Sequence, residues 1–235
     1  MADRSHIEWT DATWNPITGC TKVSEGCRFC YAERLAKRLQ AMGVARYANG
    51  FQLQLHWDLI DIPRSWRRPR HVFVNSMSDL FHESVPEDFI QAVFQTMREC
   101  PQHTFQILTK RSARLRELAP SLEWRQNIWI GVSVESQATT FRIGDLQSVP
   151  ALVRFISCEP LLGPIDHLPL SGIRWVIVGG ESGAHARPMD PSWVRAIRQQ
   201  CERASVAFFF KQWGGTRKRR AGRLLDGKEY NGMPF

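Results

Sequence analysis

Three cysteines, Cys20, Cys27 and Cys30, lie within eleven residues near the start of the chain, directly before a helical pattern. Thiolates are soft ligands that suit iron–sulfur clusters, zinc and copper(I). A structural zinc site normally takes four protein ligands, often as two closely spaced pairs, and the chain has no second Cys-x-x-Cys pair. A [4Fe–4S] cluster held by three cysteines leaves one iron open to a ligand from outside the protein. The count favours such a cluster, and the alternative is zinc with one further ligand, such as Cys158 or a histidine.

Short apolar runs recur along the chain and predict buried strands. Each is rich in Val, Ile, Phe or Trp and ends in polar residues or glycine. Continuous apolarity is typical of strands covered on both faces, as in a parallel sheet. An alternating segment over 51–57 predicts a further strand. The apolar runs lie in segments 71–81, 104–111, 128–136, 153–163, 175–183 and 206–215.

Helical patterns separate these runs. Residues 86–100 and 190–204 carry apolar residues at helical spacing, and Asp190 followed by proline is typical of a helix start. We expect Cys100 and Cys201 to be ordinary buried cysteines of these helices. A helix beginning near Cys30 carries three apolar residues on one face, Leu35, Leu39 and Met42.

The alternation of strands and helices predicts βα units and a parallel sheet. Polar residues follow nearly every strand, which favours a barrel, because the C-terminal strand ends of βα barrels build the active site. We therefore predict an α/β fold: one domain over 1–235, a single (β/α) barrel of parallel strands, complete or partial and of TIM type. A C-terminal extension over 216–235 forms either a short hairpin, a cap over the barrel mouth or a loose tail. Its Leu-Asp-Gly segment predicts a turn.

The segment CTKVSEGCRFC resembles the cluster motif of the radical S-adenosylmethionine superfamily, Cys-x-x-x-Cys-x-aromatic-Cys. The second half of the motif is kept, with Phe29 as the aromatic residue, whereas six residues separate Cys20 from Cys27. More closely, WTDATWNPITGC, NSMSDLF, SCEPLLGPI and GGESGAHARPM resemble a phage and bacterial three-Cys-motif family of largely unknown function. This resemblance covers residues 9 to about 215.

The resemblance implies an enzyme that holds a [4Fe–4S] cluster on Cys20, Cys27 and Cys30 and binds S-adenosylmethionine at the open iron. An electron from an external reductant then cleaves the sulfonium to methionine and a 5′-deoxyadenosyl radical, which abstracts hydrogen from an unknown substrate. The cofactor carries the difficult chemistry, and the protein positions it and excludes water. Phe29 is expected to pack near the adenine.

Strand-end residues are candidates for the other contacts of S-adenosylmethionine. Glu181 is expected to meet the ammonium or ribose, with Gly179 and Gly180 letting the backbone approach closely. Lys110 or Arg111 suits the methionine carboxylate. Each of these residues has a structural alternative, a salt bridge or a turn cap. Two further candidates for the ribose hydroxyls are Ser133 and Glu135.

Three residues are candidates for catalysis or substrate contact. Asp79 and Glu159 follow predicted strands and carry carboxylates. Cys158 has three alternative roles: a fourth cluster ligand, a hydrogen-atom donor, or a buried core residue. The last is favoured, because cysteine is among the most frequently buried residue types.

The formal net charge of +8 arises from 31 basic and 23 acidic residues. Part of the excess is concentrated in RSWRRPRH (64–71) and TRKRRAGR (216–223). Basic runs can contact nucleic acid, so a nucleic-acid or nucleotide substrate is one interpretation. The other is a solvated basic face without a partner.

The N-terminus has no apolar run typical of a secretory signal, and no stretch reaches the roughly 18 apolar residues of a membrane span. We therefore predict a cytoplasmic protein with no membrane segment, in which six cysteines are metal-binding, catalytic or core residues rather than disulfides. Two rival functions remain. One is a non-catalytic, zinc-stabilised nucleic-acid-binding protein, and the other is an iron–sulfur electron-transfer or sensor protein with Cys158 as fourth ligand.

Overall fold

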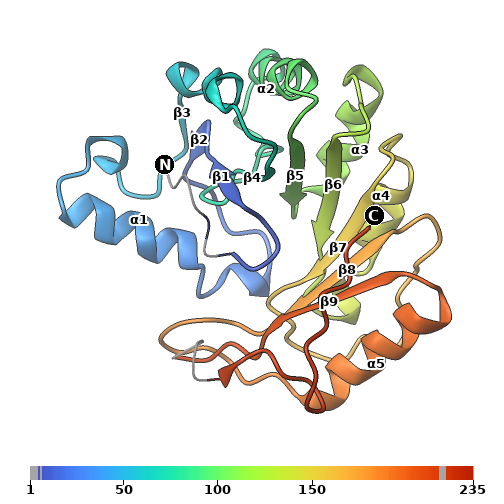
Figure 1. Cartoon of the computed structure of the whole chain (residues 1–235). Helices are drawn as coiled ribbons and strands as arrows, with labels where there is room; N and C mark the ends of the chain where they lie inside the picture. Colours follow the sequence, from blue (N-terminus) through green and yellow to red (C-terminus); the bar gives the residue numbers. More distant parts are fainter. Residues whose placement is uncertain (1–4, 6, 217–220, 235) are drawn as a thin grey trace.

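Seven parallel strands form the main sheet of the computed structural model, which describes residues 5, 7–216 and 221–234. Each pairs with the next, so the sheet follows chain order and curls into the half-barrel of Figure 1. The two edge strands, the first and the last in this order, do not pair with each other, so the sheet is an open rather than a complete barrel. The strands are β1 (Ala12–Trp14), β4 (His71–Val74), β5 (Thr104–Thr109), β6 (Ile128–Ser133), β7 (Arg154–Cys158), β8 (Trp175–Gly179) and β9 (Ala207–Gln212).

Helices cover the convex side of this sheet (Figure 1). Those of the βα units are α2 (Glu87–Glu99), α3 (Ser112–Leu118), α4 (Phe141–Gln147) and α5 (Pro191–Arg203). Their apolar faces pack on the sheet in the larger core, where residues such as Phe89 and Ile197 are fully buried. The predicted α/β fold with parallel strands is confirmed. Among the described residues, the connection from β7 to β8 is the only one between neighbouring strands of the main sheet that contains no helix.

The concave side of the sheet is filled by aromatic side chains. The ring of Trp9, in the segment before β1, lies 4.8 Å from that of Phe73 and 6.0 Å from that of Trp175. The indole of Trp175 donates to the Gly232 carbonyl oxygen at 2.7 Å. Residues from both ends of the chain therefore help to close the half-barrel below its mouth.

The described part of the C-terminal extension turns back along β9. Leu225 and Lys228 exchange backbone hydrogen bonds across Asp226 and Gly227, both of which have positive φ angles. This is the two-residue turn that suits a tight hairpin. Gly232 then donates to the Phe208 carbonyl oxygen at 3.0 Å, so the extension covers the β9 edge, which would otherwise expose unpaired backbone groups.

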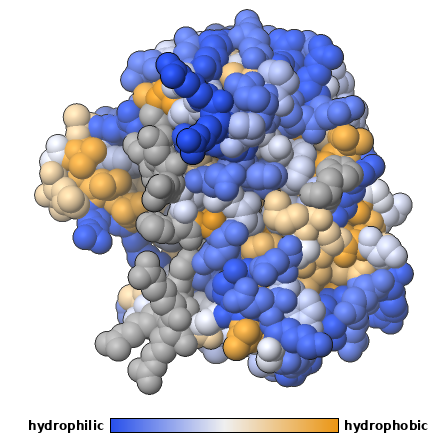
Figure 2. All heavy atoms as spheres, viewed as in Figure 1, coloured by the Kyte–Doolittle hydropathy of each residue, from blue (hydrophilic) through white to orange (hydrophobic). Residues whose placement is uncertain are grey.

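Helix α1 (Tyr31–Ala41) lies apart from the other helices, on the open side of the half-barrel (Figure 1). Its buried residues are Ala32 and Ala36, whereas Leu35 and Met42 are 40% and 65% exposed. Figure 2 shows the resulting apolar patch over this helix. The apolar face identified from the sequence is therefore divided: Leu35 and Met42 are exposed, whereas Leu39 packs beside the two alanines on neighbouring loops rather than on the sheet.

A second, antiparallel sheet joins β2 (Ile17–Thr18) to β3 (Gln54–Leu55) beside α1. The strand predicted over 51–57 is thus reduced to two residues. Among the described residues, no helix combines the length and apolarity that a membrane crossing requires. Short 3-10 helices complete the structure: η1 (Glu25–Cys27), η2 (Ala45–Tyr47), η3 (Trp57–Leu59), η4 (Ile62–Ser65), η5 (Ala119–Ser121) and η6 (Gln137–Thr139).

Candidate functional site

A cavity of about 450 Å³ lies at the C-terminal ends of the strands. Its size is within the range of small-molecule sites. The parallel register, with Trp14 beside Val74 and Val132 beside Ile156, brings the strand ends to one edge of the sheet. Most of the residues selected from the sequence line this cavity: Cys20, Cys27, Phe29, Cys30, Asp79, Lys110, Ser133, Glu159, Gly180 and Glu181. Three selected residues do not: Glu135, Cys158 and Gly179.

The three cysteines lie on one segment, residues 19–30, which we call the cysteine loop. All three are free thiols and half-buried. The Cys20 thiol accepts a hydrogen bond from the Arg111 guanidinium at 3.4 Å. Burial, reinforced by the Asp79 carboxylate, raises the pKa of Cys20 to about 11. This thiol is therefore protonated at neutral pH in the metal-free protein, and a metal bound there has to displace its proton.

Arg111 fixes the first half of the cysteine loop. Its side chain is buried, and each of its three nitrogens donates: to Glu83 at 2.8 Å, to Asp79 at 3.2 Å and to the Thr21 carbonyl oxygen at 3.1 Å. Asp79 also accepts from the Thr109 hydroxyl at 2.7 Å. Both carboxylate oxygens of Asp79 are thus engaged within the protein. Asp79 lines the cavity but holds the loop in place through Arg111.

Glu135 lies behind the cysteine loop. It accepts from the Ser24 hydroxyl at 2.6 Å and from Arg142 at 2.9 Å, and Lys110 lies 3.7 Å away. A Cβ at Gly26 would lie 2.5 Å from the Glu135 carboxylate, so the loop approaches this side chain as closely as glycine allows. Glu135 therefore anchors the loop to the end of β6 and does not face the cavity.

We expect replacement of Glu135 by glutamine to change how the free energy of unfolding depends on pH in the acidic range. Burial alone would raise the pKa of Glu135, but Lys110, Arg142 and Ser24 hold it below its ordinary 4.5. Because the folded pKa is lowered, the stabilisation is complete above about pH 4.5 and disappears as the pH falls through the folded value. Urea unfolding should show Glu135→Gln less stable by about 2 kcal/mol at pH 7, with a smaller difference at pH 3. An equal difference at both pH values would contradict this, and the exposed Glu202→Gln is the control.

Two arginines connect the loop after β8 to the elements across the opening. Arg187 donates to Glu181 at 2.7 Å and to the Glu25 carbonyl oxygen at 2.9 Å. Arg34, from α1, donates to the Ala184 carbonyl oxygen at 3.2 Å. Both Glu181 oxygens accept hydrogen bonds from Arg187. Through Arg187, this carboxylate connects the loop after β8 to the cysteine loop. Sequence reasoning missed both arginines, although Arg187 lies within the quoted segment GGESGAHARPM, because their partners are distant in the sequence.

The ring of Phe29 lines the cavity and lies beneath this bridge. The Arg187 guanidinium is 5.4 Å from its centroid, and the His185 ring is 6.0 Å away. These contacts hold Phe29 at the position where the cysteine loop meets the loop after β8.

Gly179, the last residue of β8, and Gly180 differ in the space around them. A Cβ at Gly180 would lie 2.0 Å from the Trp213 carbonyl oxygen, whereas one at Gly179 would meet the Glu159 side chain at 3.4 Å. We expect Gly180→Ala to cost about 3 kcal/mol, because backbone has to move, and Gly179→Ala to cost less than about 1 kcal/mol. Thermal unfolding of the pair tests this, and equal losses would contradict the close approach at Gly180.

Alternate residues of β7 face opposite sides of the sheet. Ser157 lines the cavity, whereas Cys158 is fully buried in the core between sheet and helices, which also contains Cys201. Burial raises the pKa of the Cys158 thiol. The next residue, Glu159, returns to the cavity, where both of its oxygens accept from Lys211 Nζ, at 2.6 and 2.9 Å.

The cysteine loop brings three thiols to the border of one cavity, and thiols are the donors with which proteins hold iron–sulfur clusters. In the described part of the chain, no three His, Cys, Asp or Glu side chains converge closely enough to hold one ion. The donor set, three thiols with an arginine hydrogen bond to one sulfur, suits a cluster.

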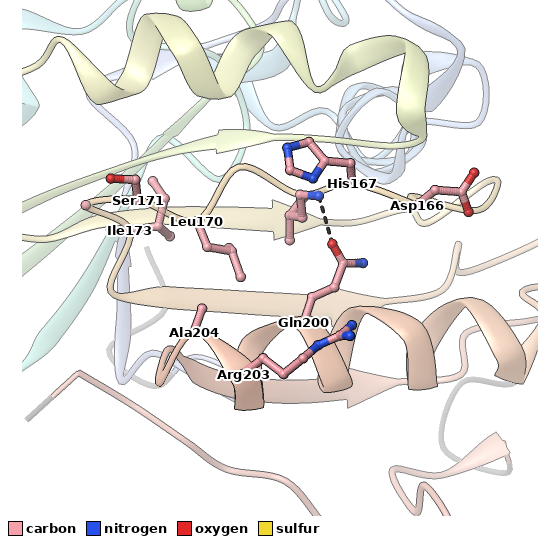
Figure 3. A pocket seen from close by; sticks show the side chains of 10 residues that line it. Asp166, His167, Leu170, Ser171, Ile173, Gln200, Arg203 and Ala204 are labelled. Carbon is pink, nitrogen blue, oxygen red and sulfur yellow. Dashed lines mark hydrogen bonds between the residues drawn. The ribbon is translucent and has the colours of Figure 1, made fainter.

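A second hollow, of about 620 Å³, lies beside the segment that leads into the N-terminal end of β8. Figure 3 shows it between the segment before β8 and the end of α5, where the Leu168 amide donates to Gln200 at 2.8 Å. The Gln200 amide group also donates to the Ile165 carbonyl oxygen at 2.9 Å. This hollow contains no cysteine and lies away from the C-terminal strand ends, so we place the functional site in the smaller cavity.

The basic runs differ in their position relative to the cavity. Residues 64–71 lead into the first residue of β4, at the end of the sheet away from the cavity. Half of the second run, residues 217–220 of 216–223, lies outside the described residues. Its preceding neighbour, Gly215, pairs with Ser182 at the cavity rim. A nucleic-acid contact through these runs stays a prediction.

Comparison with known proteins gives a family without an assigned activity. No curated protein and no solved structure matches the chain. The match to a family covers residues 4–234, which includes the cysteine loop and every strand end of the cavity. The chain belongs to the family described as protein of unknown function (DUF5131).

Proposed function

We propose that this protein is a radical S-adenosylmethionine-type enzyme, with a [4Fe–4S] cluster held by Cys20, Cys27 and Cys30. The observation that carries the proposal is that these three thiols share one cavity with the polar ends of six parallel strands. The open sheet is then a partial barrel of TIM type, used as the superfamily uses it. When bound there and reduced by an external one-electron donor, the cluster would supply the electron that cleaves the sulfonium of S-adenosylmethionine, and the resulting radical would abstract hydrogen from substrate.

In this proposal, residues of the chain bind S-adenosylmethionine, hold the cysteine loop and limit the access of water. Lys110 reaches the cavity from β5 with its side chain 20% exposed, and it supplies a cation for the methionine carboxylate. Arg111 and Glu135 hold the cysteine loop. Arg187 and Arg34 tie the loop after β8 over the open side, which limits the access of water.

Anaerobic reconstitution with iron and sulfide, followed by reduction with dithionite in the presence of S-adenosylmethionine, tests this function. The proposal predicts bound iron and sulfide and the release of 5′-deoxyadenosine and methionine. Protein that binds zinc tightly but assembles no cluster would contradict it, and so would a cluster that leaves S-adenosylmethionine intact. A matched sample without reductant controls for hydrolysis.

A further inference from the structure

Four buried polar side chains at the inner end of the cavity each have an atom without a hydrogen-bond partner among the described residues. They are Trp9 Nε1, Asn75 Nδ2, Ser157 Oγ and Gln212 Oε1. All four residues line the cavity and are less than 5% exposed, whereas the cysteines are half-buried. An unsatisfied buried polar group costs about 1–3 kcal/mol. Four such atoms around one space indicate a ligand that binds there.

The charge at this inner end is balanced. Lys211 and Glu159 form an ion pair through both carboxylate oxygens, and Lys211 is 9% exposed. The pair offers a cationic donor beside an anionic acceptor. A ligand with donors and acceptors along one edge and no net charge matches this pair and the unpartnered atoms better than an anion does, because an anion would have to compete with Glu159.

The apolar surfaces of the inner end indicate the shape of the ligand. Trp9 and Phe73 present packed rings, and Ile7 and Leu108 lie beside them on the cavity lining. Aromatic and apolar side chains bind the faces of flat rings, while polar groups read their edges. A planar heteroaromatic ring has both properties.

We propose that the inner end of the cavity binds a nucleobase as the substrate of this enzyme. The proposal rests on the function proposed above and adds the substrate class. The base is that of a free nucleoside or of a nucleotide extruded from a strand. Trp9, Ser157 and Gln212 hydrogen-bond its edge, and the Lys211–Glu159 pair supplies a further donor and acceptor.

The test measures, by calorimetry on the intact protein, the binding of the four common nucleosides and of a single-stranded DNA dodecamer. Nucleoside binding identifies the free nucleoside as the source, and binding of the dodecamer alone identifies an extruded base. Both results support the proposal, and binding of neither overturns it. Whichever of these probes binds should bind the reconstituted protein together with S-adenosylmethionine. Mutual displacement would show that the inner end holds the cofactor adenine and would also overturn the proposal.

The decisive variant is Ser157→Ala. Its hydroxyl has no partner in the described chain, so its removal should leave the melting temperature unchanged or raised while weakening base binding about two- to tenfold. Thr96→Val removes another unpartnered buried hydroxyl, on α2 and outside the cavity, and should leave binding unchanged. Equal affinities of the two variants would overturn the proposal.

The Cys20→Ser, Cys27→Ser, Cys30→Ser triple variant separates the two proposals. Nucleoside binding to this cluster-free protein supports the substrate site even if the radical function fails. Loss of binding in this variant, with its fold intact by circular dichroism, would overturn an independent site at the inner end.

Discussion

Replacing Arg111 with methionine is expected to destabilise the protein by about 3 kcal/mol. Methionine keeps much of the apolar stem but removes every hydrogen bond to Asp79, Glu83 and Thr21. The Asp79 carboxylate then remains buried beside β5 without its cation, and the buried charge left behind dominates the loss. Urea unfolding at pH 7 measures the change.

The matched control for Arg111→Met is Arg195→Met, on helix α5. Arg195 also pairs with an aspartate, Asp226, at 2.7 Å, but the two side chains are 47% and 40% exposed. Solvent screens such a pair, so we expect a loss of less than about 1 kcal/mol. Similar losses from the two variants would show that Arg111 is not the buried anchor of the cysteine loop.

Single alanine substitutions at Cys20, Cys27 or Cys30 are expected to abolish cluster assembly. Each removes one of three protein ligands, and the described structure offers no fourth thiol at the cavity, because Cys158 faces the helix layer. Bound iron should fall more than tenfold, and no S-adenosylmethionine should be cleaved. Iron analysis and the absorbance of the reconstituted variants measure both effects.

Cys158→Ala is the control for these three variants. Because its thiol lies in the core with Cys201, we expect some loss of stability, about 1 kcal/mol, and full cluster content. Loss of the cluster in Cys158→Ala with the fold intact would favour the rival electron-transfer protein, in which Cys158 is a ligand.

The sheet and the mouth of the half-barrel were predictable because their signals are local. Each apolar run contains one strand, from β4 to β9, and the polar residues after the runs meet because parallel strands align their ends. Cys158 shows the same principle, since its neighbour Ser157 must face the other way. Because side chains alternate between the two faces of a strand, Ser157 and Cys158 lie on opposite sides of the sheet.

The remaining features depend on contacts between distant segments. Trp9 lies in a polar N-terminal stretch, and nothing near it indicates that its ring fills the half-barrel against Phe73 and Trp175. The pairing of Arg187 with Glu25 spans 162 positions. The sequence predicts Glu135 as a strand-end residue that faces the cavity. In the structure its hydrogen bonds with Ser24 and Arg142 hold it behind the cysteine loop. Long-range partners decide the roles of these charged residues.

Electron paramagnetic resonance of the reconstituted, dithionite-reduced protein, recorded with and without S-adenosylmethionine, tests the central claim most directly. A three-cysteine cluster in the cavity has an open iron, so the account predicts a reduced cluster signal whose g values change when S-adenosylmethionine is added. A cluster signal that does not respond to S-adenosylmethionine, or protein that assembles no cluster with all three cysteines present, would contradict it.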